Sequence, residues 1–177
     1  MKLQGKTVLL TGATGGIGRE IAHILANEGA SLLLTGRSTE KLAALCAELG
    51  KRGEGDNAHD FFAADLANDA QRQQLVARAK AMNVQVLINL AGVNELSLLQ
   101  DMQDQAIDSI IDMNLNSPIK LARDLLAHLS AQAEGMIIMS APSWAVSAIP
   151  VPACIVPASL ASGASVKRSG GKSRIRI

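Results

Sequence analysis

The sequence contains no tyrosine, so it has no phenol group that could donate or accept a proton in catalysis. Its two cysteines, Cys46 and Cys154, have no metal-ligand spacing, and we expect two free thiols and no metal site. No apolar run reaches the length of about 18 residues that a membrane span needs, and a charged, strand-like segment follows Met1 too closely for a signal peptide. We therefore expect no membrane partner and a cytoplasmic location.

Acidic residues are absent from the last part of the chain. Residues 1–134 carry 12 Lys and Arg and all 16 Asp and Glu, whereas residues 135–177 carry 5 basic residues and no acidic one. Five cations among Ser and Gly could attract phosphate without specificity, but we favour an unselected, poorly ordered tail and expect no nucleic-acid partner. The five basic residues are Lys167, Arg168, Lys172, Arg174 and Arg176.

With 177 residues, 48% of them hydrophobic, the chain can bury the core of a single domain. Apolar runs that predict strands alternate with amphipathic patterns that predict helices. This alternation predicts an α/β fold with a Rossmann-type doubly wound parallel sheet, truncated after the fifth strand. The expected strands cover residues 7–10, 30–35, 59–64, 84–89 and 136–139, and the expected helices cover residues 18–28, 39–49, 69–82 and 106–129.

A glycine-rich turn, Thr-Gly-Ala-Thr-Gly-Gly-Ile-Gly at residues 11–18, separates the first expected strand from the first expected helix. A pyrophosphate needs backbone N–H groups and a helix N-terminus facing it, and a Cβ atom in the turn would hold it away. An ordinary tight turn is the alternative. The residues that we expect to hold the phosphates are Thr11, Gly12, Thr14, Gly15, Gly16, Ile17 and Gly18.

In the form Thr-Gly-x-x-x-Gly-x-Gly, this motif resembles that of the short-chain dehydrogenase/reductase family, and the resemblance covers residues 1 to about 139. Asp65-Leu66 matches the Asp that the family places next to adenine, although a turn or helix cap is the alternative. Residues 89–92 are similar to the family's Asn-Asn-Ala-Gly, with Leu90 in place of the second Asn. The resemblance therefore implies further contacts with a dinucleotide from Asp65, Leu66, Asn89, Ala91 and Gly92.

The end of the second strand bears on the choice of cofactor. A carboxylate there would accept from the ribose 2′-OH of NAD, whereas a cation would accommodate the 2′-phosphate of NADP. The sequence has Arg37 and no carboxylate in Thr-Gly-Arg-Ser, which favours NADP(H) over NAD(H) by charge. A solvated loop arginine is the alternative.

Asn114 is the one catalytic residue that we expect to find. Because Pro118 has no N–H, the Asn114 carbonyl four residues earlier loses its helical partner and can bind water. The resemblance implies that an Asn at this position holds a water in the family's proton relay. A helix that is merely kinked is the alternative.

The family passes a hydride between nicotinamide and the carbon of a small alcohol or carbonyl substrate, with a Tyr-x-x-x-Lys pair for the proton. This pair is absent, and the four prolines of residues 140–162 argue against a central strand or a regular helix. We therefore expect an NAD(P)H-dependent short-chain oxidoreductase that is inactive in this form. The alternative is a non-catalytic dinucleotide sensor or a subunit-interaction protein, and a homo-oligomer could form through the 106–129 helix.

A shifted reading frame explains the abrupt change after residue 139. Deleting one base from codons for Met-Ile-Ile-Asn-Val-Gly-Ser, a common fifth strand in the family, yields the Met-Ile-Ile-Met-Ser-Ala-Pro of residues 136–142. Further on, the shifted codons permit Tyr or His at the Cys154/Ile155 junction, then Cys, Ala, Ser, and Lys at the Ala158/Ser159 junction. The expected organisation is therefore a dinucleotide-binding domain, residues 1–139, and a frameshifted, poorly ordered tail, residues 140–177, rich in Pro, Ala and Ser.

Overall fold

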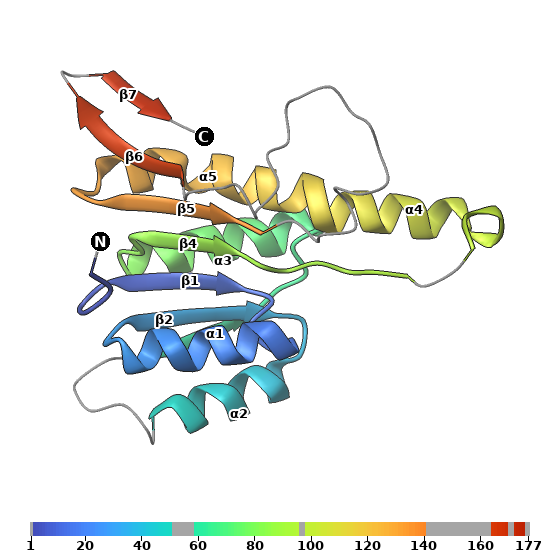
Figure 1. Ribbon diagram of the computed structural model, residues 1–177, viewed down its shortest axis with the longest axis horizontal. Helices are drawn as coiled ribbons and strands as arrows, with labels where there is room; N and C mark the ends of the chain where they lie inside the picture. The colour runs from blue at the N-terminus through green and yellow to red at the C-terminus, as the bar shows by residue number, and fades with distance from the viewer. Residues whose placement is uncertain (1, 51–58, 96–97, 141–163, 170–171, 176–177) are drawn as a thin grey trace.

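The strands of the computed structural model form one sheet in the order β3-β2-β1-β4-β5-β6-β7 (Figure 1). The first five strands run parallel to their neighbours. They are β1 (Thr7–Thr11), β2 (Ser31–Gly36), β3 (Asp60–Ala63), β4 (Val86–Asn89) and β5 (Gly135–Met139). The structure describes residues 2–50, 59–95, 98–140, 164–169 and 172–175.

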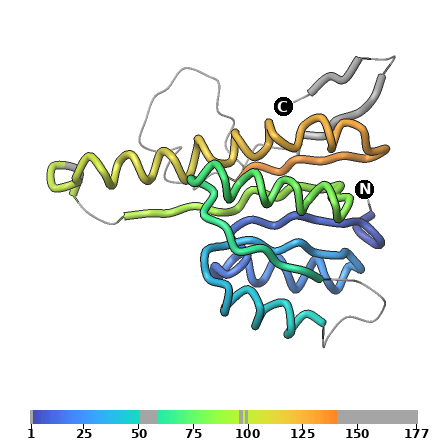
Figure 2. Tube along the Cα trace, turned by 180° about the vertical axis from the view of Figure 1, so that it is seen from behind, coloured from blue at the N-terminus to red at the C-terminus, as the bar shows by residue number. Residues whose placement is uncertain are grey.

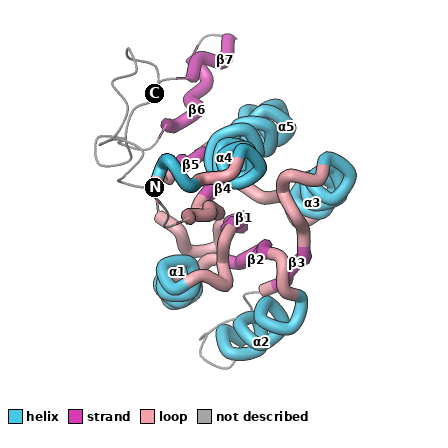
Figure 3. The backbone as a smooth tube through the Cα atoms, turned by 90° about the vertical axis from the view of Figure 1, so that its right-hand side faces the viewer, coloured by secondary structure: helices cyan, strands magenta, loops and turns pink. Residues whose placement is uncertain are grey.

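Helices cover both faces of the parallel strands. Helices α1 (Gly16–Asn27) and α2 (Thr39–Gly50) lie on one face, and α3 (Asp69–Ala81) and α5 (Ser117–Ala131) lie on the other (Figure 3). The chain changes direction across the sheet between β1 and β4, which is the point where doubly wound sheets bind their ligands. The predicted Rossmann-type parallel sheet of five strands is confirmed.

Two hydrophobic cores sandwich the sheet because successive side chains of a strand point to opposite faces. In β1, Leu10 packs toward α1 and α2, whereas its neighbour Leu9 packs toward α3 and α5. Both leucines are fully buried, as expected for a parallel strand covered on each side. Helix α5 contributes Leu121, Leu125 and Leu129, which share one buried stripe.

The long helix predicted over residues 106–129 is interrupted. Helix α4 (Asp104–Ile111) follows a short 3₁₀ helix at Leu99–Asp101 and passes through a π-helical turn at Asp112–Asn116 into α5. In this turn the Ser117 N–H donates to the Asp112 carbonyl, five residues earlier. Figure 2 shows α4 and α5 as one rod whose α4 end projects beyond the sheet. None of the helices in the described residues is long and apolar enough to cross a membrane.

Two short strands that the sequence analysis did not predict extend the sheet after β5. Strand β6 (Ala164–Ser169) runs antiparallel to β5 and pairs with its first three residues, and β7 (Lys172–Ile175) runs antiparallel to β6. The parallel part of the sheet still ends at β5, as predicted. Four of the five basic tail residues lie in β6 and β7, whereas Arg176 lies outside the described residues.

Candidate functional site

A cavity of about 500 Å³ lies at the carboxyl ends of the parallel strands. Each of the five strands leads into its wall, since residues at or just after the end of every one line it. The lining residues are Gly12, Thr14, Gly15, Gly16, Ile17, Gly18, Thr35, Gly36, Arg37, Ala64, Leu66, Leu90, Ala91, Gly92, Val93, Asn94, Met113, Asn114 and Ser140. Ligands of doubly wound sheets bind at this edge, where the strand order reverses.

Eleven of the fourteen residues predicted from the sequence line this cavity, so the motifs do converge in space. The three that do not line it are Thr11, Asp65 and Asn89. The lining residues that the sequence analysis did not name as site residues are Thr35, Gly36, Ala64, Leu90, Val93, Asn94, Met113 and Ser140. Thr35 and Gly36 end β2, and Ala64, Leu90 and Ser140 directly follow a strand, so the predicted strand ends were a signal that could have found these five.

The glycine turn packs so closely that side chains are excluded from parts of it. Gly12 has φ +68°, and a Cβ there would lie 2.8 Å from the Cα of Ala91. A Cβ on Gly18 would overlap the carbonyl oxygen of Gly12. At Gly16, in contrast, no atom of the described residues lies within 4 Å of where a Cβ would be. The turn therefore leaves open space beside bare backbone on the cavity side, which fits a phosphate cradle.

Thr11 and Asn89 brace the site from behind. The Thr11 hydroxyl accepts hydrogen bonds from the N–H groups of Leu90 and Ala91 at 2.9 and 3.0 Å, which ties β1 to the segment after β4. Asn89 is 2% exposed, and its Nδ2 donates to the Pro118 carbonyl at 3.4 Å and to the Met139 sulfur at 3.1 Å. Both side chains hold strand ends together.

Asn114 lines the cavity and clamps the segment that follows β4. Its Oδ1 accepts from the Val93 N–H and its Nδ2 donates to the Val93 carbonyl, both at 2.8 Å. A Cβ on Gly92 would lie 3.0 Å from the same Oδ1, so the glycine permits this approach. Because Pro118 has no N–H, the Asn114 carbonyl lacks its α-helical donor, and the π-helical turn lies at this point. The Asn114 side chain thus holds the segment after β4 in place beside the cavity.

The two sides of the cavity near β2 and β3 differ in polarity. Arg37 is exposed, and within the described residues it forms no hydrogen bond or ion pair. The Thr35 hydroxyl is buried and donates to the Phe62 carbonyl at 2.7 Å. Arg37 is the charged residue among the described residues that line the cavity. After β3, Ala64 and Leu66 contribute an apolar part of the wall, and each is 4% exposed.

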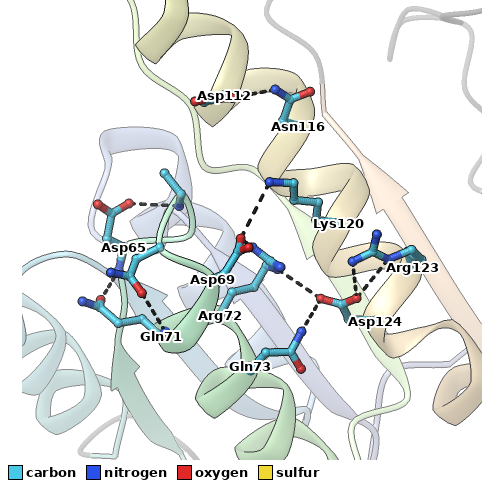
Figure 4. Close-up of polar contacts among 12 residues, drawn as sticks. Asp65, Asp69, Gln71, Arg72, Gln73, Asp112, Asn116, Lys120, Arg123 and Asp124 are labelled. Carbon is cyan, nitrogen blue, oxygen red and sulfur yellow. Dashed lines mark hydrogen bonds and ion pairs between the residues drawn. The ribbon is translucent and has the colours of Figure 1, made fainter.

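Charged side chains join α3 to α5 beside the site (Figure 4). Arg72 is 3% exposed and donates to Asp69 and to Asp124. The hydrogen bond and charge of Arg72, helped by Lys120, hold the pKa of Asp69 below its usual range. Burial acts to raise the pKa of Asp124, but the hydrogen bonds from Arg123 and Arg72 outweigh it and lower the pKa. The network therefore ties α3 to α5 on one face of the sheet.

Cys46 is a free thiol. Its sulfur donates to the His59 carbonyl at 3.2 Å, and burial, with a smaller contribution from Asp60, raises the pKa of the thiol. Such a thiol stays protonated at neutral pH and serves packing. The second cysteine, Cys154, lies outside the described residues.

The model of the short chain dehydrogenase family matches residues 6–151, which extends past the end of β5. Oxidoreductase UcpA of Salmonella typhimurium is 38% identical over 140 residues, which are 78% of this chain and 52% of the relative. The 3-oxoacyl-[acyl-carrier-protein] reductase FabG of Escherichia coli is 33% identical over 138 residues, 78% of this chain and 55% of the relative. The chain thus spans about half the length of the curated relatives that it matches.

Solved structures agree with the sequence matches. L-sorbose reductase from Gluconobacter frateurii, complexed with NADPH and L-sorbose, superposes with a TM-score of 0.77 at 25% identity, over 85% of this chain and 58% of that one. A 3-oxoacyl (acyl-carrier-protein) reductase from Agrobacterium tumefaciens with NADP bound has a TM-score of 0.69 at 26% identity, over 76% of this chain and 52% of that one. With its parallel sheet and its glycine turn, the chain belongs to the short-chain dehydrogenase family of oxidoreductases.

Proposed function

We propose that the chain binds NADP(H) in the cavity at the strand ends and that, in this form, it does not transfer hydride. The observation that carries the proposal is the glycine turn, which leaves open space beside Gly16 while Gly12 and Gly18 are packed against backbone. Bare backbone at the start of a helix is what a diphosphate requires. The solved relatives with bound NADP or NADPH support the same assignment.

Different parts of the wall would hold different parts of the cofactor. The turn over residues 12–18 would receive the diphosphate, and the free guanidinium of Arg37 would pair with the 2′-phosphate. The apolar wall at Leu66 suits the base, and the segment Ala91–Val93, held by Asn114, would border the nicotinamide. When bound, nicotinamide supplies or takes the hydride of an alcohol or carbonyl substrate.

The chain lacks the side chains that the family uses for proton transfer. The family resemblance requires a tyrosine whose phenol exchanges the proton and a lysine that lowers its pKa, and the 177 residues include no tyrosine. Loss of general acid or base help typically slows a reaction about 10²- to 10⁴-fold. The function that remains is binding, as in a dinucleotide sensor.

Titration with NADPH and NADH tests the proposal. We expect NADPH to bind more tightly than NADH, and Arg37→Ala to weaken NADPH by roughly tenfold or more while NADH is unaffected, because only NADPH carries the paired phosphate. Lys80→Ala removes an equal charge from the end of α3 that lies away from the cavity and should change neither affinity. NADPH oxidation with a panel of ketones should stay at background. Failure to bind either cofactor would refute the proposal.

An oligomer through the α4–α5 rod is favoured by its exposed apolar side chains. Ile107 and Ile111 of α4 and Ile119 of α5 are 38%, 46% and 51% exposed. Light scattering should report a homo-oligomer that the double substitution Ile107→Glu and Ile111→Glu converts to monomer. Ile24→Glu, on α1 and 60% exposed, is the matched control and should leave the assembly intact. A wild-type chain that is monomeric at high concentration would contradict this.

We also infer that residues 140–177 are read in a shifted frame. The matches to the curated relatives cover 138 to 140 residues, close to the length of the segment 1–139, in support of a change near the end of β5. The nucleotide sequence is the test. If adding one base across the codons of Ile138 and Met139 does not restore Tyr-x-Ala-Ser-Lys downstream, the inference is wrong.

A further inference from the structure

The turn between β3 and α3, residues 65–68, positions part of the cavity wall. Leu66 lines the cavity and also belongs to the hydrophobic core cluster that includes Leu75 and Val76 of α3. Its place therefore depends on how the turn is joined to the helix. A shift of the turn by a fraction of an ångström would move a wall that is otherwise rigid.

Asp65 is tied at three points (Figure 4). Its N–H donates to Oε1 of Gln71 at 2.7 Å, its carbonyl accepts from the Asn68 N–H at 3.0 Å, and its Oδ1 accepts from the Ala67 N–H at 3.0 Å. The last two bonds stay within the turn. The first is accepted by a side chain on α3 and fixes the start of the turn to the helix.

Gln71 departs from the usual helix cap. In a capping box the side chain three residues into the helix returns to the N–H of the N-cap residue. Here Asn68 is the N-cap, and its Oδ1 accepts a hydrogen bond from the Gln71 N–H at 3.1 Å. The N–H of Asn68, however, donates to the Asp65 carbonyl and not to the Gln71 side chain. The Gln71 amide reaches three residues further back instead. The Gln71 side chain thus couples the start of α3 to Asp65, the residue directly before Leu66 of the cavity wall.

We propose that Gln71 is a positioning residue for the base-binding end of the cavity, acting through the N–H of Asp65 and the turn that carries Leu66. With the N–H groups of Asp65, Ala67 and Asn68 satisfied inside the protein, only that of Leu66 is free among the four in this described turn. The turn then presents one apolar side chain and one donor to a ligand. The inference rests on the proposed NADP(H) site.

Gln71→Met tests the inference, because methionine keeps the length of the side chain but removes the acceptor. We expect this variant to bind NADPH and 2′,5′-ADP about threefold to tenfold more weakly, and by the same factor, because both ligands carry the base. Gln71→Glu keeps an acceptor and should restore most of the affinity. The matched control is Gln73→Met, which removes only an exposed bond to Asp124, 2.9 Å long, and should change neither affinity.

Amide hydrogen exchange on the ligand-free chain adds a readout that does not involve the cofactor. The Asp65 amide should be protected in the wild type and should exchange at least about tenfold faster in Gln71→Met, whereas the Leu66 amide should exchange rapidly in both. If the variant fails to fold, the wild-type pattern still decides, since an unprotected Asp65 amide overturns the inference.

The outcomes separate the two proposals. A wild type that binds neither NADPH nor 2′,5′-ADP refutes the proposed function, and the inference falls with it. A wild type that binds both, with Gln71→Met unchanged, overturns the inference alone. A variant that loses NADPH affinity much more than 2′,5′-ADP affinity also overturns it, because a general loosening of the cavity would affect the nicotinamide end as well.

Discussion

Replacing Gly16 with alanine should separate ligand binding from folding. Gly16 is the first residue of α1 and is exposed, and within the described part of the chain no atom lies within 4 Å of the position that a Cβ would take. The added methyl group therefore contacts none of these residues in the free protein. Because alanine restricts the unfolded chain and favours the helix, we expect a gain of about 0.4–1 kcal/mol in the free energy of unfolding. The melting temperature should rise by about 1–4 °C.

Cofactor binding should respond in the opposite direction. The methyl group would stand between the backbone N–H groups of the turn and a diphosphate in the cavity, so at least one hydrogen bond to a charged group is lost. Such bonds contribute about 1.5–3 kcal/mol, which corresponds to roughly a 10- to 150-fold weaker affinity for NADPH. Calorimetric titration measures the affinity, and thermal unfolding without ligand measures the stability.

Gly50→Ala is the control for this experiment. Gly50 ends α2 and is exposed, and likewise no atom of the residues that the structure describes lies within 4 Å of an added Cβ, but Gly50 does not line the cavity. The control should leave NADPH affinity unchanged. If Gly16→Ala binds NADPH as tightly as the wild type, the diphosphate does not lie against this turn and the assignment of the cradle is wrong. If Gly16→Ala unfolds instead, the space around Gly16 has been misjudged.

Three further predictions concern stability. Gly18→Ala should lower the melting temperature by several degrees in thermal unfolding, because its Cβ overlaps a backbone carbonyl. Asn114→Ala removes both bonds to the segment after β4 and should cost about 2 kcal/mol in urea unfolding and weaken NADPH binding. Asp69 and Asp124 have lowered pKa values, so the free energy of unfolding should fall as the pH drops below about 4. Arg72→Met should make this dependence of stability on pH less steep, and an unchanged dependence would contradict the role of the network.

The parallel sheet could be predicted because each strand is a short apolar run bounded by turn residues. Buried strands of this kind leave few alternatives in an alternating α/β sequence. The break between α4 and α5 was harder to see. Pro118 marked a lost hydrogen bond, but the apolar periodicity continues through it, and a π-helical turn absorbs the mismatch without ending the rod. Strands β6 and β7 could not be predicted from an apolar run, because their sequences are mostly polar and basic.

Site residues that line the cavity with their backbone could be predicted from the sequence. Residues whose role depends on the direction of the side chain were harder to predict. The glycines of residues 12–18 line the cavity, and they could be predicted because the spacing of glycines in the sequence determines the shape of the turn. Thr11 and Asn89 also lie at strand ends, yet their side chains turn inward to brace neighbouring segments. Position in a motif does not reveal which way a polar group points. Gln71 was missed for the related reason that its partner is a backbone N–H six residues earlier.

The proposed cofactor binding and the family's proton transfer depend on different parts of the sequence. The cavity wall and the contacts that hold it, such as Thr11 to Ala91 and Asn114 to Val93, all lie within residues 11–140. The tyrosine and lysine of the family's chemistry would have to come from beyond it, where the sequence departs from the pattern. Retained binding without turnover is therefore the expected combination. Turnover with NADPH would instead require a proton donor on the wall itself, and the hydroxyl of Ser140 is the first to test.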